Sequence, residues 1–162
     1  MNIRVATSGD FDAIWPIFQQ VVAAGDTYGY RPDTSKEDAF HLWMESPRQT
    51  YLVEVDGQIL GTYYLKTNQE GPGAHVCNCG YMVAAAARGQ GLATLMCEHS
   101  QREAVRLGYR AMQFNLVASS NVGAMALWEK LGFAQVGRLP LAFNHPKRGF
   151  VDALVMYKWL VD

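Results

Sequence analysis

The sequence predicts one α/β domain over residues 1–162, with helices on both faces of a single mixed sheet. The pair Asp56-Gly57 separates two β-rich runs and is typical of a tight turn between antiparallel strands. Strands near residues 75–83 and 111–117 flank a helix, and such a crossover implies a parallel pair. The order of elements, β-α-α-β-β-β-α-β-α-β-β, therefore predicts about seven strands, most of them antiparallel.

The N-terminal part of the chain begins with a short strand at residues 2–6. Thr7 and Asp10 then resemble a capping box, with an acid in place of the usual glutamate. Apolar residues follow at helical spacing: Phe11, Ile14, Phe18, Val21 and Val22. Pro16 lies inside this pattern, so the helix either bends there or starts later.

The next segment, residues 24–35, is predicted to be a loop because it is rich in Gly, Asp and Pro. Ser35 with Asp38 can cap a second helix. One face of that helix carries three large apolar residues, Phe40, Trp43 and Met44. The hairpin around Asp56-Gly57 follows.

The C-terminal half alternates helices and strands. A helix with apolar positions at Leu92, Leu95 and Met96 ends near Gly108, and residues 110–118 form a strand. Asn121 opens another helix, which Gly132 closes. Two final strands, at residues 133–137 and 150–160, are predicted to be separated by a long loop that contains proline.

Composition indicates a folded globular protein, since 49 % of residues are hydrophobic and 18 % are charged. The net charge is −1 and there is no basic run, which argues against nucleic-acid and membrane-surface partners. Residues 1–10 lack the pattern of a signal sequence, and we expect a cytoplasmic protein. The three cysteines, Cys77, Cys79 and Cys97, are an odd number and fit reduced thiols.

A turn of small residues joins the strand that ends near Val83 to the following helix. Amides at the start of a helix lack intrahelical partners, so this turn can bind an anion. A Walker-type loop is excluded because no Gly-Lys-Ser/Thr triplet occurs. A dinucleotide fingerprint would need glycine in place of Thr94, and an acid between Glu103 and Glu129 that is absent. The remaining pattern is Arg-x-x-Gly-x-Ala; the alternative is a glycine turn that merely starts a helix.

A second motif, NVGAMALWEKLGF at residues 121–133, lies downstream at the start of another helix. Together the two motifs resemble the GNAT family of acetyl-CoA-dependent N-acyltransferases, and the order of elements matches over most of the chain. The resemblance implies that strands 75–83 and 111–117 splay apart and receive the pantetheine arm of acetyl-CoA. The implied contacts to acetyl-CoA are Met82, Val83, Ala85, Arg88, Gly89, Gln90, Gly91, Leu92, Ala93, Thr94 and Asn121.

The implied chemistry is direct transfer of the acetyl group to an amine. The resemblance implies a backbone N–H near Met82 or Val83 as the donor to the oxyanion. Many relatives carry a tyrosine that protonates the leaving thiolate, whereas this chain has Trp128 there. An indole N–H is a poor acid, so we expect Trp128 to pack in the core and water to protonate the thiolate.

Two asparagines on predicted core strands are candidate catalytic residues. Asn78 and Asn115 can satisfy loose backbone at the splay, or they can face the acceptor and orient its amine. The segments GDTYGY, GAHVCN and FNLV resemble the branch of the family that acetylates azetidine-2-carboxylate and related cyclic imino acids. Both asparagines match that branch's active-site asparagines.

The expected acceptor is a small-molecule amine, and an amino or cyclic imino acid is one candidate. Residues expected to contact it are Tyr28, Tyr30, Arg31, His75, Asn78 and Asn115. His75, Cys77 and Cys79 share one strand face, but no fourth zinc ligand is evident and no metal is expected. A homodimer is common in such folds. The alternatives are a peptide or protein acetyltransferase, a noncatalytic CoA-binding module and, more distantly, a dinucleotide-binding module.

Overall fold

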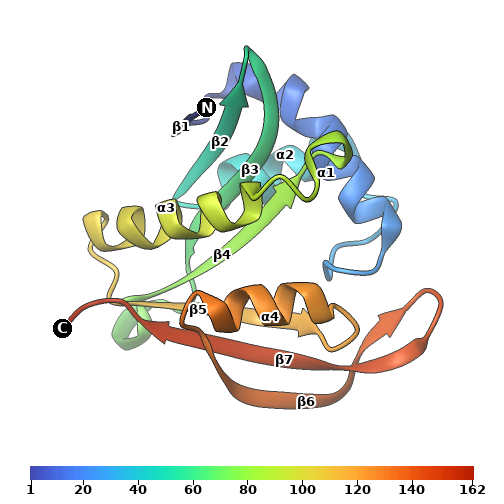
Figure 1. Cartoon of the computed structure of the whole chain (residues 1–162), viewed down its shortest axis with the longest axis vertical. Coiled ribbons are helices and arrows are strands. Elements are labelled where there is room, and N and C mark those ends of the chain that lie inside the picture. Colours follow the sequence, from blue (N-terminus) through green and yellow to red (C-terminus); the bar gives the residue numbers. More distant parts are fainter.

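The computed structural model describes residues 1–162 and contains one seven-stranded sheet with the order β1-β2-β3-β4-β5-β7-β6 (Figure 1). The strands are β1 (Asn2–Val5), β2 (Gln49–Val55), β3 (Gln58–Thr67), β4 (Val76–Val83), β5 (Ala111–Ala118), β6 (Ala134–His145) and β7 (Gly149–Trp159). The α-helices are α1 (Phe11–Ala24), α2 (Lys36–Phe40), α3 (Leu92–Arg106) and α4 (Val122–Lys130). This order of elements and the mixed sheet confirm the predicted fold class.

Every neighbouring pair of strands is antiparallel except β4 and β5, which run parallel as the crossover predicts. These two strands pair only at residues 76–78 and 111–113, and beyond that point they separate. Figure 1 shows them diverging, with α4 beside β5. The splay is the structural feature that positions the candidate site.

Local signals in the sequence explain where several elements begin. The Asp10 carboxylate accepts a hydrogen bond from the Thr7 amide at 2.8 Å, and the Ser35 hydroxyl accepts one from the Asp38 amide at 3.1 Å. Helix α1 starts at Phe11 and continues through Pro16. No helix is both long enough and apolar enough to cross a lipid bilayer.

The predicted loop between the last two strands is wrong. Strand β6 continues to His145, so only residues 146–148 separate it from β7. Pro140 fits within β6 because this strand is at the edge of the sheet, where a missing N–H breaks no ladder. A bulge between Leu139 and Phe143 absorbs the irregularity, and the amide of Leu141 donates to the Asp152 carboxylate at 2.9 Å.

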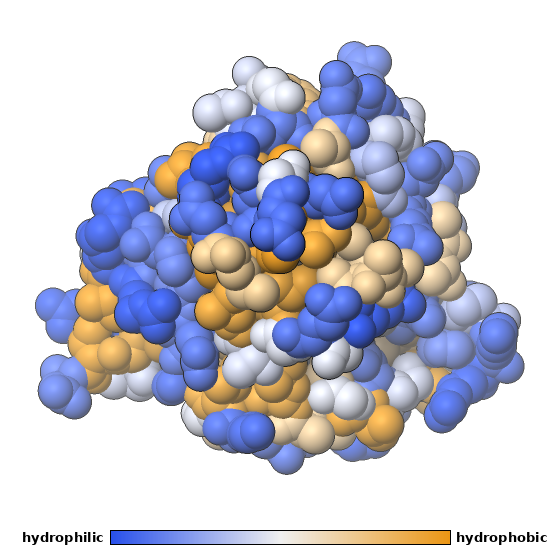
Figure 2. All heavy atoms as spheres, turned by 45° about the horizontal axis from the view of Figure 1, so that its top comes forward, coloured by the Kyte–Doolittle hydropathy of each residue, from blue (hydrophilic) through white to orange (hydrophobic).

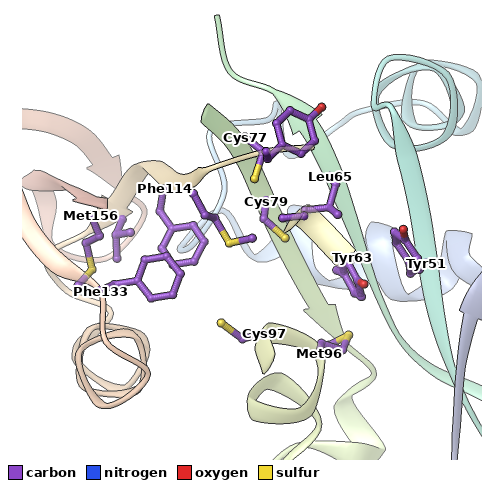
Figure 3. Packing of buried hydrophobic residues seen from close by; sticks show 14 of the residues in the cluster. Tyr51, Tyr63, Leu65, Cys77, Cys79, Met96, Cys97, Phe114, Phe133 and Met156 are labelled. Carbon is purple, nitrogen blue, oxygen red and sulfur yellow. The ribbon is translucent and has the colours of Figure 1, made fainter. Parts of the chain in front are cut away.

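The sheet separates two apolar clusters. One lies under α3 and α4 and contains the three cysteines (Figure 3). All three are buried as free thiols, which confirms the prediction of reduced cysteines. The other lies under α1 and α2 around Phe18, Trp43 and Tyr64. On the face drawn in Figure 2, hydrophobic residues gather near the centre and hydrophilic residues surround them. Burying both faces of the sheet fixes which side of β4 each side chain occupies.

Candidate active site

The separation of β4 from β5 opens a cavity of about 710 Å³. Residues from six parts of the chain line it: the end of α1 with the loop that follows, β3, β4, the glycine turn with the start of α3, β5, and α4 with its cap. The lining is mostly apolar. Its polar side chains come from Asp26, Thr27, Tyr28, Tyr30, Tyr64, Asn78, Tyr81, Arg88, Asn115 and Asn121.

The edge of β4 that faces this cavity has no strand partner beyond Asn78. The amide of Ala84 donates to the carbonyl of Leu60 on the β3 side. Because the backbone groups of successive strand residues point to opposite edges, the N–H and C=O groups of Tyr81 and Val83 point to the open edge. The Tyr81 carbonyl there accepts a hydrogen bond from the Tyr28 hydroxyl at 2.7 Å. An unpaired strand edge of this kind can pair with an extended, amide-containing ligand such as pantetheine.

The turn between β4 and α3 presents a row of free amides. Gly89 and Gly91 have φ of 76° and 80°, a conformation that favours glycine. None of the amides from Gly89 to Thr94 donates to a backbone or side-chain acceptor in the chain, and Leu95 is the first residue to do so, at 3.1 Å to Gly91. The exposed Arg88 guanidinium is also unpaired. This concentration of donors fits a diphosphate.

Asn78 stands at the last paired position of the parallel strands. Its Nδ2 donates to the Gln113 carbonyl at 2.9 Å, and its Oδ1 accepts from the Tyr64 hydroxyl at 2.7 Å. Burial raises the pKa of Tyr64 well above its ordinary value, so the phenol stays neutral and donates at physiological pH. The amide orientation of Asn78 is therefore fixed from both sides while the residue lines the cavity.

Aromatic side chains form the wall on the α1 side. Tyr28 and Tyr30 stack with their ring centroids 5.6 Å apart at an interplanar angle of 7°. Tyr64 pairs with Gly80 across the β3–β4 ladder, and a Cβ at Gly80 would lie 2.7 Å from the Tyr64 ring. Gly80 thus lets both Tyr28 and Tyr64 lie directly on the backbone of β4.

Asn115 is exposed on β5 and also lines the cavity. Its Nδ2 donates to Asn68 Oδ1 at 2.7 Å, and its Oδ1 accepts from Gln113 Nε2 at 3.0 Å. Asn121 caps α4, because its Oδ1 accepts from the Ala124 amide at 3.3 Å, and it lines the cavity as well. The structure therefore brings all three asparagines to one cavity.

Trp128 lies between Tyr81 and Phe114, with centroid distances of 5.2 and 5.0 Å. It is half-buried and packs against the cluster under α3 and α4, which confirms the expected packing role. Tyr81 cannot replace the missing tyrosine acid at the cavity, because its hydroxyl bonds Ser100 at 2.7 Å in the core.

Two residues expected at the acceptor site lie elsewhere. Arg31 does not line the cavity; its guanidinium pairs with Asp33 at 3.0 Å and is largely exposed. His75 precedes β4 and packs near Trp159, with ring centroids 6.1 Å apart. It is three residues before Asn78, roughly 10 Å back along the strand, and β4 runs away from it towards the cavity.

The residues expected to contact acetyl-CoA differ in how they contribute to the site. The side chain of Leu92 is buried in the core, so only its amide can face a ligand. Gln90 donates from its side chain to the Ala86 carbonyl at 3.1 Å and so braces the turn. Of the residues expected to contact acetyl-CoA, five line the cavity: Met82, Val83, Arg88, Ala93 and Asn121. The other six do not: Ala85, Gly89, Gln90, Gly91, Leu92 and Thr94.

Sequence reasoning missed many of the cavity residues, among them Asp26, Thr27, Tyr64 and Gly80. A glycine in the middle of a strand indicates close approach by another group, so Gly80 could have drawn attention to its partner across the hairpin. The acid and the threonine lie in a loop of the kind that carries function, but no local pattern predicts that they reach the cavity.

The chain matches the model of the acetyltransferase (GNAT) family over residues 13–133. The structure of a GCN5-related N-acetyltransferase from Kribbella flavida superposes with a TM-score of 0.92 at 43 % identity, covering 98 % of this chain and 97 % of that one. N-acetyltransferase aca1 from Schizosaccharomyces pombe is 33 % identical over 107 residues, which are 65 % of this chain and 51 % of that protein. The chain thus spans about half the length of aca1, and its match to Protein SPT10 of Saccharomyces cerevisiae covers 18 % of that protein. The fold also resembles that of yncA from Salmonella typhimurium, solved with its cofactor acetyl-CoA, with a TM-score of 0.84 at 22 % identity over 100 % of this chain and 95 % of that one.

Proposed function

Because the chain belongs to the acetyltransferase (GNAT) family, we propose that it is an acetyl-CoA-dependent N-acetyltransferase that acts on the amine of a small molecule. The observation that carries the proposal is the open edge of β4 leading into the row of free amides from Gly89 to Thr94. One continuous surface thereby offers strand-like pairing for pantetheine and donors for a diphosphate.

Acetyl-CoA, when bound, supplies the activated acetyl thioester. The chain's own residues would position the reactants, and positioning accounts for a large share of catalysis in such transfers. Arg88 and the turn amides hold the phosphate end, Tyr81 and Val83 offer backbone at the splay, and Asn121 lies beside them. Apolar side chains, including that of Trp128, form most of the cavity wall.

The acceptor enters, in this proposal, from the side of the α1–α2 loop, where Tyr28 and Tyr30 form the wall. Asn78 is held rigid by Tyr64 and the Gln113 carbonyl, so it acts as a fixed point of the cavity wall. Asn115 is bonded only to other side chains and can exchange a partner for the acceptor with less disturbance of the backbone. We therefore assign Asn115 to orienting the amine.

The test is incubation of the protein with acetyl-CoA and a panel of amines, with the release of free thiol as the readout. The panel contains amino acids, azetidine-2-carboxylate and other cyclic imino acids, polyamines and simple primary amines. Silence across the whole panel would refute the small-molecule proposal. Tight acetyl-CoA binding without transfer to any amine or peptide would favour a noncatalytic CoA-binding module, for which Trp128 at the usual acid position is the motivating observation.

Substitution of Asn115 tests the assignment within the site. We expect Asn115→Ala to lower turnover at least tenfold while acetyl-CoA binding changes little. Asn68→Ala is the matched control, because it removes the partner of Asn115 without touching the cavity lining. Equal losses of turnover and of acetyl-CoA binding in Asn115→Ala would instead show a structural role.

A further inference from the structure

The acceptor half of the cavity contains one acid that the proposed function leaves unassigned. Asp26 follows Gly25, which ends α1 with φ of 67°, and it lines the cavity while half-buried. Its carboxylate makes no hydrogen bond and no ion pair within the chain. It is also the only carboxylate among the residues that line the cavity.

The charge in the cavity is divided between two different segments. Arg88, the only cationic side chain in the lining, belongs to the glycine turn, where the phosphates are expected. Asp26 belongs to the loop after α1. The one cationic side chain of that loop, Arg31, pairs with Asp33 outside the cavity. The acceptor half therefore carries one uncompensated negative charge and no positive one.

The neighbours of Asp26 also suit a cation. Aromatic rings attract cations, and Tyr28 and Tyr30 line the cavity two and four residues further along the loop. The Thr27 hydroxyl is buried without a hydrogen-bond partner and lines the same cavity. A buried polar atom without a partner requires an explanation, and a bound polar ligand supplies one.

We propose that Asp26 is the counter-ion of the acceptor: it binds the incoming amine as an ammonium and selects cationic amines over zwitterionic amino and imino acids. The selectivity follows because a carboxylate on the acceptor would be repelled by the carboxylate of Asp26, and no cationic side chain in this half of the cavity would offset that repulsion. This inference rests on the proposed function and narrows its acceptor class.

Asp26 is assigned to binding and not to proton removal. A neighbouring carboxylate stabilises the charged form of an amine, which favours capture but does not help the amine lose its proton. Loss of Asp26 should therefore raise the acceptor KM and leave kcat little changed. Acetyl-CoA, whose phosphates are expected at Arg88, should bind as before.

The experiment compares one scaffold in two charge states, azetidine-2-carboxylate and its methyl ester. The wild-type enzyme should acetylate the ester with a kcat/KM at least tenfold above that of the free acid. Asp26→Asn should reduce kcat/KM for the ester about tenfold or more through KM, and the ratio of ester to acid should fall. Comparing ratios between the two enzymes cancels the different basicities of the two amines.

Two further variants sharpen the result. Asp33→Asn removes an acid of the same loop that pairs with Arg31 outside the cavity, and should leave the ratio unchanged. Asp26→Lys should invert the preference towards the free acid. Both Asp26 variants should melt within a few degrees of the wild type, because Asp26 has no partner in the chain to lose.

A binding measurement separates this inference from the proposed function. Calorimetry of the ester with the enzyme–CoA complex should show weaker binding for Asp26→Asn whether or not transfer occurs. If no amine is acetylated but the ester binds through Asp26, the transferase proposal is overturned and the subsite stands. If transfer is robust and both Asp26 variants keep the wild-type ratio and ester affinity, the assignment of Asp26 is overturned alone.

Discussion

Gly80→Ala perturbs the cavity wall through a single methyl group. The added Cβ would lie 2.7 Å from Tyr64 Cε1 and 3.1 Å from the Tyr28 hydroxyl. Carbon atoms pack at about 3.5 Å or more, so the Tyr64 ring must move by about 0.8 Å or the strand must shift. That movement disturbs the hydrogen bonds from Tyr64 to Asn78 and from Tyr28 to Tyr81, both 2.7 Å long.

The expected cost follows from overpacking and from the strained hydrogen bonds. Overpacking a close contact costs about 1–3 kcal/mol, and each weakened hydrogen bond adds up to about 1 kcal/mol. We expect the free energy of unfolding to fall by about 2–3 kcal/mol, which corresponds to roughly 4–12 °C in Tm for a chain of this length. Because Tyr28 and Tyr64 line the acceptor half, the acceptor KM should rise more than the acetyl-CoA KM.

The assay pairs urea unfolding with steady-state kinetics, and Gly61→Ala is the matched control. A Cβ at Gly61 would meet the flexible end of Met96 at 3.2 Å, which can move at a cost below about 1 kcal/mol. The reasoning fails if Gly80→Ala is as stable as Gly61→Ala and keeps the wild-type acceptor KM.

Three other predictions concern the thiols, the N-terminal cap and the glycine turn. Burial raises the pKa of Cys77 to about 12 and also raises the pKa values of Cys79 and Cys97. Native protein at pH 8 should therefore react with a disulfide reagent about three orders of magnitude more slowly than a free thiol does. Rapid stoichiometric labelling would contradict this prediction. The hydrogen bonds from Arg4 hold the pKa of Asp10 far below its ordinary 3.8, so this carboxylate stabilises the fold above about pH 4 and loses that effect as the pH falls further. Asp10→Asn should thus cost about 1 kcal/mol near neutral pH, and its difference from wild type in urea unfolding should shrink in acid; a difference that is constant with pH would refute the assignment. Gly91→Ala should lower the free energy of unfolding by about 1–2 kcal/mol through the φ of 80° alone, since the added Cβ would meet no atom within 4 Å. It should also raise the acetyl-CoA KM. A melting curve and an acetyl-CoA titration that match those of the wild type would show that the turn relaxes freely.

Local patterns were sufficient for most of the fold. The hairpin at Asp56-Gly57 is predictable because its turn needs left-handed backbone, and φ of 49° and 78° confirm that geometry. The bounds of β6 were not predictable, since Pro140 reads as a loop signal unless the strand is known to lie at the edge of the sheet.

The sequence by itself also determined the glycine turn that we propose for the phosphates, because the free amides and the left-handed glycines belong to one continuous segment, residues 89–94. Only the tertiary structure decided the other half of the site. Asn78 gains its fixed orientation from Tyr64 on β3 and from Gln113 on β5. Asp26 reaches the same cavity from a loop that lies about 50 residues before Asn78 in the chain. Periodicity and motif spacing describe neighbours along the chain, whereas the proposed acceptor half consists of contacts between distant segments that packing alone brings together.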